Sequence, residues 1–319
     1  MSVTKFGLFN ITDGVVYKTV AGLSLKTSIM VPKKPFASDK RPVMVHWHGG
    51  GYMLGSRMFE PWFGAWLMQL AEQRGAIVVS PDYRLLPEAT TDDMLDDVES
   101  FFTWLHSDLN KEVQKSTEGK LEVDLNSLAV FGESAGGYLS IQSGILCPNA
   151  GIKAIVSQYG SVDMDHPNFS APGGVIFGEP AQPLAKANEF IAAYHAKHVD
   201  VPNPKVRLEA SPGELWPLAV AYLNAGKLGD AVGKGPRANP IKGIEGVKSF
   251  PPIAFTHGKQ DSVVPCDNTI DFAKKLGQLL PEVPMHVETP DGEHGFDGEV
   301  TLDAPWVKNI VAFLNKYWP

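Results

Sequence analysis

Several features that would define a protein class are scarce in this 319-residue chain. Its two cysteines, Cys147 and Cys266, are too few for a disulfide framework, although spacing alone leaves one bridge open. No apolar run reaches the roughly 18 residues that a membrane-spanning helix needs. The stretch after Met1 lacks the apolar core of a secretion signal, so we expect a cytoplasmic protein without a membrane partner.

The chain also lacks any long basic run, and its formal net charge is −8. An acidic surface repels phosphate backbones, which argues against a nucleic acid partner. His46 and His48 flank Trp47 but have no third candidate metal ligand nearby in the sequence. We therefore expect neither a metal nor an organic cofactor.

What the chain does contain is a repeated alternation of apolar runs and helical stretches, which is typical of a mostly parallel sheet flanked by helices. A strand pair fits 15–31, and further strands are expected at about 42–47, 76–80, 127–132, 152–158, 252–257 and 284–289. Helices are expected at about 60–74, 91–107, 135–146, 267–279 and 303–317. The charged stretch 112–122 is expected to be a surface loop.

One short motif singles out a serine. Residues 132–136 read Gly-Glu-Ser-Ala-Gly and lie between an apolar strand-like run and a helical stretch. A strand that ends in Gly-x-Ser-x-Gly and turns at once into a helix exposes the serine hydroxyl on a sharp turn. The motif alone is weak, because 31 glycines make a chance match common. With this context, Ser134 becomes a candidate nucleophile.

A second glycine motif supplies that context. Residues 48–51 read His-Gly-Gly-Gly and follow the buried strand-like run 43–45. Consecutive glycines leave backbone N–H groups uncovered, and such donors can stabilise the oxyanion of a tetrahedral intermediate. The alternative is a plain glycine-rich turn, which the presence of the serine motif makes the weaker interpretation.

A hydrolytic serine needs a base and a carboxylate that orients the base. Among nine histidines, His294 stands out because it lies in a turn-rich loop after a strand-like run. Asp261 follows the buried run 252–255 in the same way. Asp267 and Asp271 are the alternative acids, but we expect both on the following helix.

Together these motifs resemble the α/β-hydrolase superfamily, and within it the hormone-sensitive-lipase-like carboxylesterases that carry a His-Gly-Gly-Gly motif. The residues that carry the resemblance are His48–Tyr52, Pro81–Leu85, Pro87–Glu88, Gly132–Gly137, Asp261 and His294–Phe296. The resemblance implies an α/β-hydrolase fold with Ser134 as nucleophile, His294 as general base and Asp261 as its orienting carboxylate. Glu133 stands where relatives carry Asp or Glu, and we leave it outside the catalytic set.

The resemblance also implies an oxyanion hole made by the backbone N–H groups of Gly50, Gly51 and Ala135. The implied reaction is hydrolysis of a small-molecule carboxylic ester through an acyl-enzyme, by a monomer or homodimer. The same triad could act on a lactone, an amide or a carrier-bound thioester. A non-hydrolytic reaction such as isomerisation or acyl transfer, or a ligand receptor, also stays open.

The proline-rich segment 161–250 interrupts the alternation, with helical stretches near 184–197 and 213–225. It is too long for a plain loop in a compact sheet. In the resembled superfamily a lid commonly follows this strand, so we expect a catalytic core of 1–160 and 251–319 with a lid at 161–250. Tyr52, Phe177 and Trp216 are the candidate pocket residues.

Overall fold

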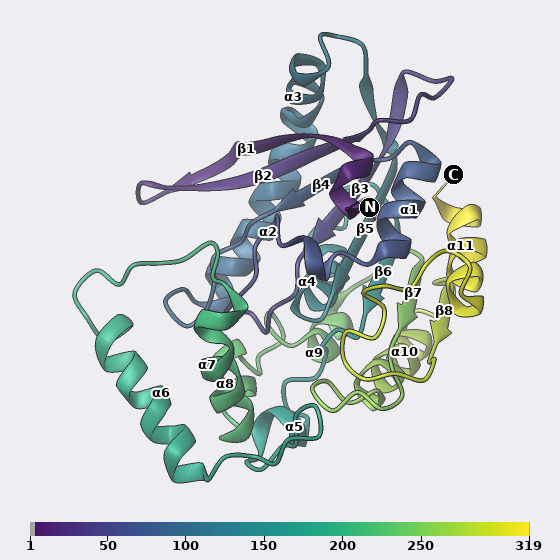
Figure 1. The fold of residues 1–319 in the computed structure, drawn as a ribbon. Coiled ribbons are helices and arrows are strands. Elements are labelled where there is room, and N and C mark those ends of the chain that lie inside the picture. The colour runs from purple at the N-terminus through teal and green to yellow at the C-terminus, as the bar shows by residue number, and fades with distance from the viewer. Residues whose placement is uncertain (1–3, 319) are drawn as a thin grey trace.

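The structure is a computed structural model that describes residues 4–318. The first three residues and Pro319, which belong to the termini considered above, lie outside this range. A single eight-stranded sheet runs through the molecule in the order β1-β2-β4-β3-β5-β6-β7-β8 (Figure 1). The pairs β1–β2 and β2–β4 are antiparallel, and all other neighbouring strands are parallel. This topology confirms the predicted fold class.

Every predicted strand is present. The strands are β1 Phe9–Val20, β2 Leu23–Pro32, β3 Lys40–Trp47, β4 Ile77–Pro81, β5 Glu122–Glu133, β6 Ile152–Gln158, β7 Ile253–Thr256 and β8 Met285–Glu288. The strands β4 and β7 are buried along their whole length, because helices cover both faces of the sheet. This explains why these strands read as continuous apolar runs rather than as alternating ones.

Helices cover the two faces of the sheet. They are α1 Ala65–Arg74, α2 Thr91–Ser107, α3 Leu109–Ser116, α4 Ala135–Leu146, α10 Asp267–Leu279 and α11 Pro305–Tyr317. The apolar side chains of α1 and α11 form one buried cluster, and those of α2, α3, α4 and α10 belong to another. The expected helix over 60–74 is divided, because a 3-10 turn at Glu60–Trp62 precedes Gly64, the N-cap of α1.

The surface loop predicted over 112–122 was wrong in its first part. Helix α3 extends through Ser116, a loop follows at 117–121, and β5 begins at Glu122. Only Leu109 and Val113 of α3 are buried, one helical turn apart. Because the helix buries only two side chains, its other positions can be polar or charged. A charged composition therefore favoured a loop in the sequence analysis.

The insertion 161–250 folds into helices around one end of the sheet (Figure 1). They are α5 Pro167–Ser170, α6 Leu184–His198, α7 Pro212–Asn224, α8 Leu228–Val232, α9 Pro240–Gly243 and the 3-10 turn Ile244–Gly246. Its buried side chains join the same hydrophobic cluster as those of β3 and α2. The division into a core and a lid at these boundaries therefore remains a prediction.

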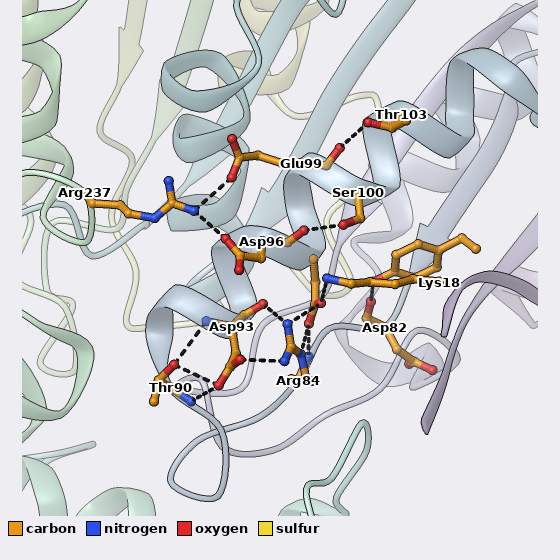
Figure 2. Close-up of polar contacts among 12 residues, drawn as sticks. Lys18, Asp82, Arg84, Thr90, Asp93, Asp96, Glu99, Ser100, Thr103 and Arg237 are labelled. Carbon is orange, nitrogen blue, oxygen red and sulfur yellow. Dashed lines mark hydrogen bonds and ion pairs between the residues drawn. The ribbon is translucent and has the colours of Figure 1, made fainter. Parts of the chain in front are cut away.

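Charged residues fasten the last part of this insertion to α2. Arg237 pairs with Asp92, Asp96 and Glu99 at 3.2, 2.7 and 2.8 Å. Arg84, in the loop between β4 and α2, binds the carboxylates of Asp93 and Asp97 on the same helix, as Figure 2 shows in part. The acidic residues of α2 are therefore divided between two arginines.

Within residues 4–318, no helix combines the length and the apolar character needed to cross a bilayer.

Candidate active site

Ser134 lies on a strained turn between β5 and α4. Its backbone φ is +56° with ψ −119°, a conformation that non-glycine residues adopt only when their surroundings enforce it. The two motif glycines permit the close packing that enforces it. A Cβ on Gly136 would lie 1.9 Å from the Trp47 carbonyl oxygen, and one on Gly132 would lie 2.3 Å from that of Gly136. The two glycines of the motif are thus required by backbone packing.

The structure brings Ser134, His294 and Asp261 together from loops that follow three different strands. The Nε2 atom of His294 lies 3.0 Å from Ser134 Oγ, and its Nδ1 atom lies 2.8 Å from Asp261 Oδ2. With a carboxylate at Nδ1, the proton of a neutral imidazole belongs there, which leaves Nε2 free to accept the serine proton. This is the arrangement that activates a serine hydroxyl.

Asp261 is held as an ionised carboxylate. Its Oδ1 atom accepts hydrogen bonds from the backbone N–H groups of Val263 and Val264 at 2.9 and 2.8 Å. Burial raises the pKa of Asp261, but interactions with His257 and His294 outweigh this effect and lower the pKa to about 2. The alternative acids Asp267 and Asp271 lie exposed on α10, as expected.

The glycine loop follows β3 and borders the same cavity as Ser134. Gly50 and Gly51 have φ values of +117° and +54°, and a Cβ on Gly50 would lie 2.0 Å from the Leu54 carbonyl oxygen. Ala135 is the first residue of α4, so its N–H has no carbonyl acceptor within the helix. The role of these three N–H groups as an oxyanion hole remains a prediction.

The side chains of Glu133 and His48 hold the glycine loop through hydrogen bonds to the Gly49 backbone. The carboxylate of Glu133 accepts a hydrogen bond from the Gly49 N–H at 2.7 Å and lies 2.8 Å from His46 Nε2. The Nδ1–H of His48 donates to the Gly49 carbonyl at 2.8 Å, and its ring stacks on Tyr83. Sequence reasoning left Glu133 outside the catalytic set. Its place inside the serine motif was the available signal that it lies close to the site.

A cavity of about 330 Å³ opens over Ser134 and His294. Phe177 and Trp216 from the insertion line it, with ring centroids 5.9 Å apart. Its remaining side-chain walls are mostly apolar and come from Leu54, Pro61, Trp62, Ala219, Leu223 and Val263. An apolar wall of this kind is suited to a hydrophobic acyl or alcohol group.

The prediction that Tyr52 lines the pocket was wrong. Its side chain is 1% exposed, its hydroxyl is hydrogen-bonded to Ser161, and its ring packs edge-on against Tyr138. Tyr52 follows the glycine loop directly, but with φ +68° the chain turns its ring into the core. Proximity in sequence to the glycine motif therefore did not place this side chain in the cavity.

Asp297 is a pocket residue that sequence reasoning missed. It is buried, borders the cavity, and accepts hydrogen bonds from Tyr159 Oη at 2.6 Å, Gln158 Nε2 at 2.5 Å and Trp66 Nε1 at 3.2 Å. The edge of the Tyr159 ring meets His294 at a centroid distance of 4.8 Å. Asp297 thus anchors the histidine loop to β6 and α1. Its only sequence signal was its position shortly after His294.

Across the described part of the chain, no group of three or more His, Cys, Asp or Glu side chains is arranged to hold a metal ion.

Comparison with known proteins identifies the fold family. A family model described as an alpha/beta hydrolase fold matches residues 44–222. Probable carboxylesterase M8 from Phoma sp. is 36% identical over 307 residues, which cover 95% of this chain and 94% of that relative. Non-reducing polyketide synthase ascC from Acremonium egyptiacum is 32% identical over 158 residues, 48% of this chain and 7% of the synthase.

Among solved structures, one from a study of two fungal esterases from Rhizomucor miehei superposes with a TM-score of 0.60 at 22% identity. The match covers 97% of this chain and 84% of the esterase, and at this identity it supports the fold. The chain belongs to the α/β-hydrolase family, since the family model matches more than half of it. Its similarity to a probable carboxylesterase over almost its whole length places it among the carboxylic ester hydrolases of that family.

Proposed function

We propose that the protein hydrolyses neutral carboxylic esters through a covalent acyl-enzyme. Ser134 is the nucleophile, His294 the general base and Asp261 the carboxylate that orients it. The observation that carries this proposal is the continuous contact from Ser134 Oγ through His294 to Asp261, at 3.0 and 2.8 Å. The cavity above Ser134 leaves room for a substrate carbonyl next to the glycine loop.

In the acylation step, Ser134 Oγ attacks the carbonyl carbon while His294 Nε2 takes the hydroxyl proton. The electron pair of the C=O bond moves to oxygen, and the N–H groups of Gly50, Gly51 and Ala135 stabilise that negative charge. Loss of one such donor typically costs about 3 kcal/mol of transition-state stabilisation. When the tetrahedral intermediate collapses, the ester C–O bond breaks and His294 returns the proton to the leaving alcohol.

Deacylation repeats these steps with water as the nucleophile. His294 removes a proton from the water, the carbonyl carbon passes through a second oxyanion, and Ser134 leaves with the proton restored. Because interactions with His257 and His294 outweigh the effect of burial and keep Asp261 ionised, the imidazolium formed in each half-reaction is always paired with a negative charge. Apart from the attacking water, the groups that carry these steps belong to the chain itself.

The direct test is labelling of the intact protein with a fluorophosphonate, together with turnover of p-nitrophenyl butyrate. We expect one adduct, located on Ser134, and its absence from Ser134→Ala. Turnover by Ser134→Ala should fall by at least about 10⁴-fold, as for other nucleophile deletions. Ser100→Ala, a change on the outside of α2, is the control and should label normally. Turnover retained by Ser134→Ala would refute the assignment.

A carrier-bound or free acyl thioester is the second candidate substrate. The observation that favours it is the 32% identity to a segment of a non-reducing polyketide synthase. The same attack by Ser134 would then release a thiol instead of an alcohol. Matched pairs of an oxygen ester and an N-acetylcysteamine thioester with the same acyl group distinguish the two. A kcat/KM that is higher for the oxygen ester, after correction for the uncatalysed rates, supports the esterase.

A further inference from the structure

A carboxylate outside the triad joins the two loops that carry Asp261 and His294. Glu293 directly precedes His294, and its Oε1 atom accepts the backbone N–H of His294 at 2.7 Å. The same atom accepts the backbone N–H of Ser262 at 2.6 Å, and Ser262 directly follows Asp261. Hydrogen bonds to an ionised acceptor are shorter and stronger than neutral ones. One oxygen atom thus fixes the distance between the two catalytic loops.

Ser262 extends this connection into the insertion. Its Oγ atom accepts the backbone N–H of Phe177 at 2.8 Å. Phe177 has a φ of +52°, an unfavourable conformation for a bulky residue that requires support from outside its own segment. Its ring is 46% exposed, borders the cavity and lies 6.4 Å from the His294 ring between centroids. The hydrogen bond from Phe177 to Ser262 supplies such support.

We propose, on the basis of the function proposed above, that Glu293 is a positioning residue for the triad. It holds the Asp261 and His294 loops in register and, through Ser262, sets where Phe177 meets the substrate. Transfer of a proton from Ser134 depends on the 2.8 Å contact between His294 Nδ1 and Asp261. A misplacement of about 1 Å at a reacting centre can cost about 10²-fold in rate.

Glu293 and the Ser262 hydroxyl make different contacts, so the effect on kcat can be separated from the effect on KM. Glu293 supports both catalytic loops, so its loss should lower kcat. The Ser262 hydroxyl supports only Phe177, whereas the Ser262 N–H donates to Glu293, and an alanine keeps that N–H. Loss of the hydroxyl should therefore weaken substrate binding and raise KM while kcat stays unchanged.

The experiment compares three variants by kcat, KM and the rate of fluorophosphonate labelling, with p-nitrophenyl butyrate as substrate. We expect Glu293→Leu, which has no acceptor, to lose about 10- to 100-fold in kcat and in labelling rate. Glu293→Gln keeps a carbonyl oxygen and should return to within about threefold of wild type, because a neutral acceptor still makes both bonds. For Ser262→Ala we expect a KM raised about fivefold, the effect of roughly 1 kcal/mol.

Asp291→Asn is the matched control. Asp291 lies on the same loop and also faces the acid loop, but it is exposed and reaches Lys259 and Gln260 only at 3.6 and 3.4 Å. This variant should match wild type in all three measurements. If Glu293→Leu does not fold, Glu293→Asp takes its place, since the shorter side chain cannot reach both N–H groups.

Wild-type kcat in folded Glu293→Leu or Glu293→Asp would overturn the positioning role. An unaltered KM in Ser262→Ala would overturn the connection to Phe177. These results differ from failure of the proposed function, in which the wild type itself neither labels nor turns over the ester. With an active wild type, the Glu293 variants test the positioning of the triad, and Ser262→Ala tests the connection to Phe177.

Discussion

At the residue scale, His48 combines complete burial with an ionisable ring. Its Nδ1–H donates to the Gly49 carbonyl and its ring stacks on Tyr83. Burial lowers the pKa of His48 from the ordinary 6.5 to about 3, so the ring is neutral wherever the enzyme is folded at moderate pH. The residue that braces the glycine loop therefore adds no charge to the proposed oxyanion hole.

This burial predicts a loss of stability in mild acid. The unfolded chain binds a proton at His48 below pH 6.5, whereas the folded chain does so only near pH 3. The contribution of His48 to the free energy of unfolding is thus at its full value above pH 6.5, and it declines as the pH falls from 6.5 to 3. At pH 5 the decline amounts to about 2 kcal/mol. Urea unfolding at pH 7 and pH 5 measures it.

His48→Asn is the comparison for that measurement, because its amide can donate to the Gly49 carbonyl but does not titrate. Between pH 7 and pH 5, we expect the free energy of unfolding of this variant to fall by about 2 kcal/mol less than that of the wild type. Equal declines in the two proteins would show that His48 does not resist protonation in the folded state.

At the element scale, an ion pair attaches the insertion to the loop that follows β4. Arg207 Nη2 donates to both carboxylate oxygens of Glu88 at 2.6 and 2.7 Å, and the Glu88 side chain is 2% exposed. Tyr194 of α6 donates to the same carboxylate at 2.6 Å. Gly55 and Ala210 exchange two backbone hydrogen bonds nearby. These contacts hold the segment between α6 and α7 against the core.

Removal of the arginine should therefore be costly. Arg207→Leu leaves the buried Glu88 carboxylate without its cation, and we expect the free energy of unfolding to fall by about 3 kcal/mol. The double variant Glu88→Gln with Arg207→Leu buries no charge and should recover part of this loss. Urea unfolding measures both, and limited proteolysis near residue 200 reports on the attachment itself. A double variant that is less stable than Arg207→Leu would contradict this account.

The elements that the sequence predicted well are those with a strong local signal. Helix α2 occupies its predicted range because a capping box from Thr90 and Asp93 starts it and five or more apolar side chains repeat along one face. The missed helices α5, α8 and α9 have four or five residues each, too few to show a period.

The site shows the same division. The glycine motifs predicted where Ser134 and the glycine loop would lie, because close backbone packing demands glycine within a few residues. The roles of Glu293 and Asp297 were not predictable in this way. Glu293 reaches Ser262 and Asp297 reaches Gln158, both distant in the chain, and a carboxylate in a loop carries no local signal for a distant N–H donor.

At the scale of the whole molecule, the side chains that border the cavity over Ser134 carry charge of the same sign as the protein. The chain carries a net charge of −8. Among the described residues that border the cavity, the charged ones are Glu133 and Asp297, and none is lysine or arginine. A site bordered by carboxylates and by no lysine or arginine offers no counter-ion to offset the desolvation of an anionic substrate. The cavity should therefore select neutral esters.

The prediction compares p-nitrophenyl butyrate with the p-nitrophenyl monoester of succinic acid, which is similar in size but carries a carboxylate. At about 8 Å from one buried carboxylate and an effective dielectric constant of about 20, the repulsion is about 2 kcal/mol. We therefore expect kcat/KM for the anionic ester to be lower by about 30-fold at low ionic strength. Added salt should narrow this gap, because it screens the net negative field of the molecule, and should leave the neutral ester almost unaffected. Equal kcat/KM values for the two esters would mean that a cation from elsewhere in the chain reaches the cavity during turnover.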